Sequence, residues 1–81
     1  MEKYNSAFDL VTEDPAEREM LKLRSMVMSD VNNWIRIEEL TQVQAAVIIG
    51  CDQPRISELK NGRLSKFSLD WLTKAMIKLQ A

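Results

Sequence analysis

The stretch from Thr41 to Gly62, TQVQAAVIIGCDQPRISELKNG, contains two short helical patterns with almost nothing between them. The first pattern begins at Thr41, has Gln44 to complete a capping box, and ends at Gly50, a residue that tolerates positive φ. The second begins at once, with Asp52 as its N-cap, and ends at Gly62. Because the link is so short, the sequence predicts two helices that cross at a fixed and steep angle.

Two short helices joined by a glycine-containing turn form a helix-turn-helix unit. We expect the second helix to protrude from the domain while the first braces it. Pro54 is tolerated in the first turn of the second helix, because the N–H groups there have no intrahelical partner. The small side chain of Ala46 lets the two helices approach closely. The expected core positions of this pair are Ala45, Ala46, Ile49, Ile56 and Leu59.

A long helix precedes the pair and a final helix follows it. Asp14, Pro15 and Glu17 are a typical helix start, and apolar residues at spacings of three, four and seven continue the pattern to about Ile37. The final helix begins at Ser68. The apolar positions of the long helix are Met20, Leu21, Leu23, Val27, Met28, Val31, Trp34 and Ile35, and those of the final helix are Leu69, Leu72, Ala75, Met76 and Leu79.

These elements predict an all-α fold with four to five helices, in one small domain over residues 14–81. Residues 1–13 are interpreted as an N-terminal arm. The apolar residues of the arm follow no clear period and are Tyr4, Phe8, Leu10 and Val11. The arm either packs on the domain or on a partner, or it is a flexible, disordered end.

Composition excludes several classes of protein. The chain of 81 residues has one Cys and no His, so it can form neither an intrachain disulfide nor a zinc site of Cys and His ligands. It has no long apolar run and no secretory start, so we expect a cytoplasmic protein with no membrane partner. Because it lacks a glycine-rich phosphate loop and a nucleophile–base pair, we expect no cofactor, no metal, no catalytic residue and no enzymatic activity. Cys51 is interpreted as a small buried hydrophobe.

The formal net charge of −1 hides an asymmetry between the two halves of the chain. Residues 1–40 carry five Lys and Arg against nine Asp and Glu, a net charge of −4, whereas residues 41–81 carry six against three, a net charge of +3. A basic half favours the docking of an anion on one face. Lys74 and Lys78 are interpreted as a solvated face of the final helix.

The spacing TQxxxAxxxGxxQxxIxxLxNG resembles the helix-turn-helix of the Cro/cI-type (XRE) family of bacterial and phage regulators. The residues that match are Thr41, Gln42, Ala46, Gly50, Gln53, Ile56, Leu59, Asn61 and Gly62. The segment QPRISELKNGRLSKFSLDWL is similar to the HigA-like branch, many of whose members are antitoxins or autorepressors encoded beside an RNase toxin. The resemblance implies a lambda-repressor-like fold. Branch members often continue past the final helix, whereas this sequence stops at Ala81.

The resemblance also implies which residues contact double-stranded DNA. In this geometry the second helix of the unit enters the major groove and the first lies across the backbone. Gln42 is placed to donate to a phosphate, and Gln53 to pair with adenine; Arg55 contacts either guanine or a phosphate. The remaining expected contacts are Pro54, Ser57, Glu58, Lys60, Asn61, Arg63 and Lys66. Pro54 stands where the family more often has a polar residue, so it removes one direct base donor, and Glu58 either accepts from cytosine or repels a phosphate.

A single module of this size contacts too few bases for useful specificity, so we expect a homodimer that reads half-sites about 34 Å apart. Two surfaces are candidates for the dimer contact. One is the final helix with Trp71 and Met76, which we favour. The other is the strip formed by Val43 and Val47, where family members often have polar residues.

The sequence therefore predicts a sequence-specific DNA-binding transcriptional regulator, a repressor that acts as a dimer. The alternative is an antitoxin that neutralises an RNase toxin and autoregulates its operon, with the long helix and the arm contacting the toxin. A third alternative is an adaptor that keeps the fold without DNA binding.

Overall fold

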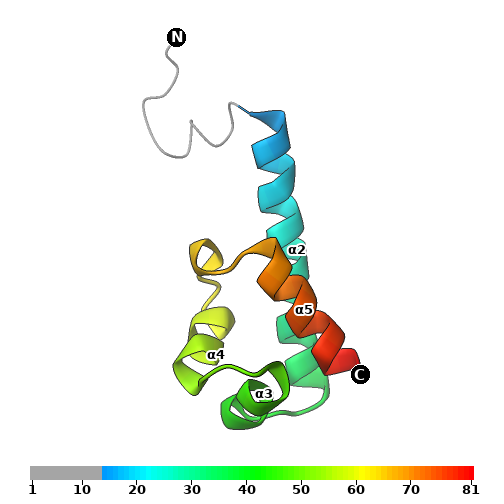
Figure 1. Ribbon diagram of the computed structural model, residues 1–81, viewed down its shortest axis with the longest axis vertical. Helices are drawn as coiled ribbons and strands as arrows, with labels where there is room; N and C mark the ends of the chain where they lie inside the picture. Colours follow the sequence, from blue (N-terminus) through cyan, green and yellow to red (C-terminus); the bar gives the residue numbers. More distant parts are fainter. Residues whose placement is uncertain (1–13) are drawn as a thin grey trace.

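The computed structural model of the chain describes residues 14–81, which form four α-helices and one 3-10 turn and contain no strand (Figure 1). The elements are α2 (Pro15–Ile37), α3 (Gln42–Ile49), α4 (Gln53–Lys60), η1 (Leu64–Lys66) and α5 (Leu69–Gln80). The expected all-α fold, with its long first helix and central helix-turn-helix, is confirmed. The two interpretations of the arm concern residues 1–13, which lie outside the described part of the chain.

The caps that the sequence indicated are present at the helix ends. The Asp14 carboxylate accepts a hydrogen bond of 2.9 Å from the Ala16 N–H at the start of α2. At the start of α3, the Thr41 N–H donates to Gln44 Oε1 at 2.8 Å, and the Gln44 N–H donates to Thr41 Oγ1 at 3.1 Å. Asp52 Oδ1 accepts from the Arg55 N–H at 3.0 Å at the start of α4. The helix boundaries therefore follow from local hydrogen bonding.

The turn between α3 and α4 is built on Gly50, whose φ is +87°. The carbonyl oxygen of Ala46 accepts from the N–H of Gly50 at 2.7 Å and from the N–H of Cys51 at 3.0 Å. A residue with a Cβ is strained at this φ, which explains the glycine. The chain then enters α4 after Asp52, so the two helices are held close to the angle that this turn sets.

The core lies where α3, α4 and α5 meet the C-terminal half of α2 (Figure 1). Its members are Met28, Val31, Ile35, Ala45, Ala46, Ile49, Ile56, Leu59, Phe67, Leu72 and Ala75. The five core positions expected within the helix-turn-helix are thus all buried. Phe67, just before α5, is fully buried in this core and contacts the Trp71 ring.

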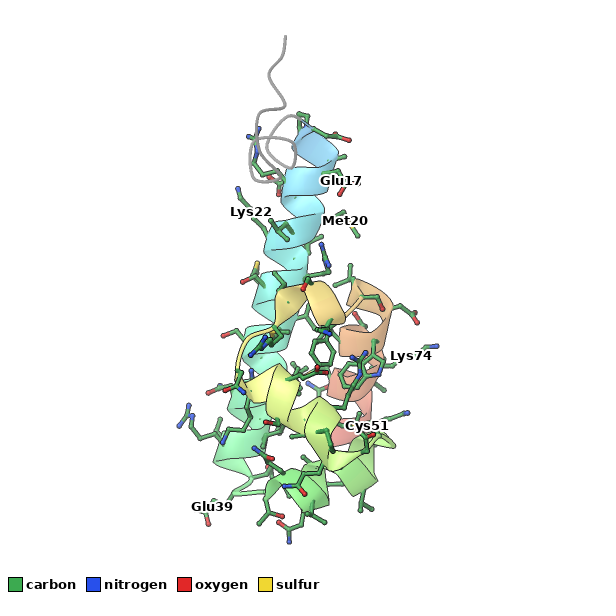
Figure 2. All side chains as sticks on the ribbon, turned by 90° about the vertical axis from the view of Figure 1, so that its left-hand side faces the viewer. Glu17, Met20, Lys22, Glu39, Cys51 and Lys74 are labelled. Carbon is green, nitrogen blue, oxygen red and sulfur yellow. The ribbon has the colours of Figure 1, made fainter. Side chains whose placement is uncertain are left out.

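The N-terminal half of α2 extends beyond the other described helices (Figures 1 and 2). Met20 and Leu23, expected on the apolar stripe, are exposed there, as is Met26. The helix is confirmed, but Met20 and Leu23 are not buried as the pattern predicts. Leu21 is partly buried, and Arg24 in the same stretch donates to the Phe67 carbonyl at 3.4 Å.

Side chains from α2 and α5 bind backbone carbonyls of the helix-turn-helix. Asn32 Nδ2 donates to the Leu59 carbonyl at the end of α4 at 3.0 Å, and Lys78 Nζ donates to the Ile49 carbonyl at the end of α3 at 3.0 Å. Lys78 is exposed, as expected, but its ammonium group also has this capping role, which the sequence did not predict. Its ammonium group satisfies a carbonyl that the helix leaves unpaired and lies at the negative end of the helix dipole.

We predict that Lys78→Met, which keeps the apolar stem and removes the ammonium group, lowers the free energy of unfolding by roughly 1 kcal/mol. Chemical denaturation followed by circular dichroism measures the change. Lys74→Met is the matched control, because the ion pair of Lys74 with Asp70, at 3.3 Å, is exposed and its loss should change stability by less than about 0.5 kcal/mol. Equal effects of the two substitutions would contradict the capping role.

Candidate nucleic-acid interface

The side of α4 that faces away from the core is exposed from its first turn. Ile56 and Leu59 are fully buried, whereas Gln53, Pro54 and Asn61 are exposed and Ser57 is partly exposed. These four outward residues recur at helical spacing, so they share one face. Figure 2 views the molecule from the side on which α4 lies in front, with Cys51 just before its start. The first turn of α4 is thus free to meet a ligand.

Gln42 and Gln53 connect the first turns of α3 and α4. Gln53 Nε2 donates to Gln42 Oε1 at 3.3 Å. This bond leaves the amide hydrogens of Gln42 as donors and Oε1 of Gln53 as an acceptor. The structure therefore brings together the residue expected at a phosphate and the residue expected at a base, and it orients each carboxamide by the other.

Arg55 lies on the opposite flank of α4, against the start of α5. Its guanidinium carbon is 4.3 Å from the centroid of the Phe67 ring and 5.2 Å from that of Trp71. The two rings are themselves 4.8 Å apart and tilted by 56°. The Arg55 side chain keeps 31% of its surface exposed, so one edge of the guanidinium remains accessible. Stacking of this kind holds the planar group in a fixed orientation.

Glu58 is flanked by two cations. Its carboxylate oxygens lie 3.6 Å from Arg55 Nη1 and 3.9 Å from Lys66 Nζ. The negative charge that was expected to repel a phosphate is therefore compensated locally. Arg63 and Lys66, after the end of α4, are exposed and extend the basic part of this surface.

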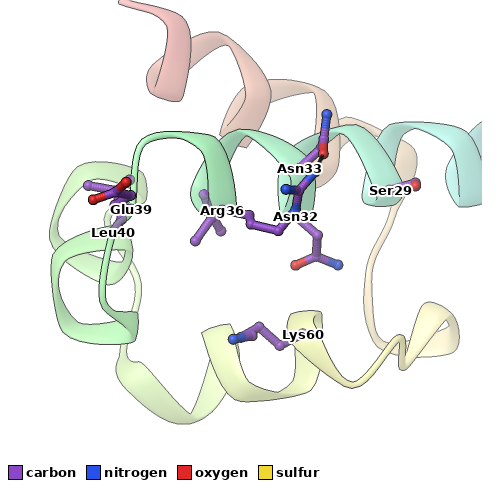
Figure 3. A pocket seen from close by; sticks show the side chains of 8 residues that line it. Ser29, Asn32, Asn33, Arg36, Glu39, Leu40 and Lys60 are labelled. Carbon is purple, nitrogen blue, oxygen red and sulfur yellow. Dashed lines mark hydrogen bonds between the residues drawn. The ribbon is translucent and has the colours of Figure 1, made fainter.

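Lys60, seven residues after Gln53, is exposed at the edge of this face, on the side of α4 towards α2. It lines a groove of about 590 Å³ between α2 and α4, opposite Asn32 and Arg36 (Figure 3). Ser29, Asn33, Ile35, Glu39 and Leu40 complete the lining of this groove. The sequence predicts that Lys60 is exposed, but it gives no sign that α2 lies beside this residue.

The two surfaces expected to form a dimer contact differ in their environment. Trp71 and Met76 are partly buried and pack against the core, and Trp71 also contacts Phe67 and Arg55. Val43 and Val47 are exposed on the outward side of α3. The α2 helix therefore does not cover them.

Cys51 is partly buried and packs against the core in the turn before α4. Burial raises the pKa of its thiol, and the neighbouring Asp52 carboxylate raises it further, against the opposing effect of Arg55 and Lys78. The thiol is therefore neutral near pH 7, as befits an apolar packing residue.

Comparison with known proteins gives one match. A family model described as a helix-turn-helix domain matches residues 10–80, whereas no match was found among curated proteins or among solved structures. Among residues 14–81, none of the helices combines the length and the apolar character needed to cross a bilayer. The match covers nearly the whole chain and agrees with the capped helix pair, its glycine turn and the exposed face of α4. The chain therefore belongs to the helix-turn-helix domain family.

Proposed function

We propose that this protein is a sequence-specific DNA-binding transcriptional repressor that occupies its operator as a dimer. The observation that carries the proposal is the exposed first turn of α4. Gln53 and Pro54 are accessible to solvent there, and Gln53 is hydrogen-bonded to Gln42 at the start of α3. In the helix-turn-helix geometry this turn is the part that meets base edges in the major groove.

In this proposal each part of the surface has its own role. Gln53 reads adenine with its carboxamide, and Ser57 and Asn61 contact bases or backbone one and two turns further along α4. Gln42 donates to a phosphate on one strand at the start of α3, where the N–H groups of the helix also favour an anion. Arg63 and Lys66 neutralise phosphates on the other strand.

Arg55 has a different role from the base reader that the resemblance implied as one option. Because its guanidinium stacks on Phe67 and pairs with Glu58, only its exposed edge is available to DNA. That edge suits a phosphate better than the bidentate contact to guanine, which needs the whole fork to reach the groove. Repression then follows from occupation of the operator and needs no catalytic group.

A second candidate function is an antitoxin that binds an RNase toxin and autoregulates its operon. It is favoured by the N-terminal half of α2, which extends beyond the other described helices (Figure 1) and carries the exposed residues Met20, Leu23 and Met26. The neighbouring gene decides between the two functions. If it encodes a toxin, Leu23→Asp should abolish neutralisation and leave DNA binding intact; without a toxin gene this candidate is lost.

We predict that Gln53→Ala weakens binding to an operator, obtained by selection from random DNA, by about 1–3 kcal/mol, because the adenine contact is lost. Binding to scrambled DNA should be unchanged. Fluorescence anisotropy with both duplexes measures the two affinities, and Gln80→Ala at the exposed end of α5 serves as the matched control. An equal loss on both duplexes would show that Gln53 does not read a base.

We also predict that Lys66→Gln reduces the slope of log affinity against log salt concentration by about one, because one fewer counterion is released from the DNA. Lys74→Gln, which removes an exposed lysine of α5, should leave the slope unchanged. Titrations at several salt concentrations test both variants. A wild-type protein without any salt dependence would instead favour an adaptor that has lost DNA binding.

A further inference from the structure

Glu58 is an acidic residue on a surface that is otherwise neutral or basic. Among the residues expected to contact DNA, it alone carries a negative charge. Because DNA phosphates are anions, a carboxylate at this place lowers the affinity for a duplex of any sequence. The contacts of Glu58 with its neighbours indicate how this effect arises.

The chain turns back after α4 and brings a lysine to the Glu58 carboxylate. Gly62 has a φ of +72°, and the Arg63 N–H donates to the Glu58 carbonyl at 3.1 Å. This turn leads into η1, whose last residue, Lys66, has its Nζ 3.9 Å from Glu58 Oε2. The other carboxylate oxygen, Oε1, lies 3.6 Å from Arg55 Nη1. Each oxygen of Glu58 therefore faces a different cation.

Both cations remain accessible to a ligand. The Arg55 guanidinium is held in place on the Phe67 and Trp71 rings, but its side chain is partly exposed, and the Lys66 side chain is 55% exposed. A phosphate that approaches this flank of α4 meets the same two cations that the Glu58 carboxylate already contacts. Carboxylates and phosphates are both oxyanions that pair with Arg and Lys. The two anions therefore compete for the same partners.

We propose that Glu58 is an internal competitor of DNA phosphate, which pairs with Arg55 and Lys66 in the free protein and lowers the affinity for DNA of any sequence. The inference rests on the proposed function, because it concerns the same surface. Phosphate contacts supply essentially all of the affinity for non-specific DNA, so the competition limits the time that the protein spends on random sequence. The base contact of Gln53 then remains the main source of affinity for the operator.

Removal of the Glu58 charge tests this role. Glu58→Gln keeps the shape of the side chain and should bind both the operator and scrambled DNA roughly tenfold more tightly at about 0.1 M salt, because two exposed ion pairs no longer have to be broken. The slope of log affinity against log salt concentration should become steeper by about one. The reason is that the wild-type carboxylate, once its partners turn to phosphates, takes up a cation from solution and offsets one of those released.

Fluorescence anisotropy with both duplexes at several salt concentrations measures the affinity and the slope. Glu19→Gln is the matched control, because it also removes one negative charge from an exposed ion pair, with Lys22 at 3.4 Å. Glu19 lies on the N-terminal half of α2, away from α4 (Figure 1), so this substitution should change neither quantity. Circular dichroism verifies that each variant is folded.

A double substitution separates ion pairing from simple repulsion. If Glu58 acts through its two partners, the gain from Glu58→Gln should fall to about threefold in a Lys66→Gln background, because only the pair with Arg55 is left to break. Equal gains in the two backgrounds would show that the carboxylate only repels phosphates at a distance, and would overturn the inference.

The remaining outcomes separate this inference from the proposed function. Unchanged affinity of Glu58→Gln, together with a steep salt dependence of the wild type, would refute the competition and leave DNA binding standing. A loss of affinity confined to the operator would assign Glu58 to a cytosine contact, and a loss on both duplexes would make it a structural link between α4 and η1. Either loss overturns the inference. If neither the wild type nor any variant binds a duplex, the proposed function fails and the inference fails with it.

Discussion

The left-handed turn at Gly50 is the constraint on which the rest of the structure depends. The Ala46 carbonyl accepts hydrogen bonds from the N–H groups of Gly50 and Cys51, the two residues that follow α3. The Lys78 ammonium group donates to the Ile49 carbonyl at the same end of α3. A Cβ at Gly50 would be strained at a φ of +87° and would stand 3.8 Å from the Lys78 ammonium. Because the chain reverses here within three residues, α4 lies across α3 and must turn one face to solvent. The bare first turn of α4 follows from this geometry.

The remaining helices convert that geometry into a preorganised surface. Asn32 on α2 holds the end of α4 through the Leu59 carbonyl, and the Phe67 and Trp71 rings support its flank through Arg55. Each of these contacts restrains α4 from a different side. A helix held in this way loses little conformational freedom if it binds a ligand, so less of the contact energy is spent on ordering it.

The helix boundaries could be predicted from the sequence because they are local: a capping box, an Asp N-cap and a glycine each act within four residues. The contacts that hold the unit in place are not local. Lys78 reaches Ile49 across 29 positions and Asn32 reaches Leu59 across 27, and neither pair leaves a periodic signal. The exposure of Met20 and Leu23 escaped prediction for a related reason: their spacing is that of a core stripe, and only the tertiary fold shows that the other elements of residues 14–81 leave them exposed. The stacking of Arg55 on the Phe67 and Trp71 rings likewise could not be predicted, because it depends on the tertiary fold.

If the outward face of α4, with Gln42 beside it, meets DNA, the amide NMR signals of this surface should shift when the uniformly labelled protein is titrated with its selected operator. We expect the largest shift changes at Gln42, over residues 53–61 and at Arg63 and Lys66, with little change in the first turns of α2. Changes concentrated on the N-terminal half of α2, with the amides of α4 unaffected, would contradict the account.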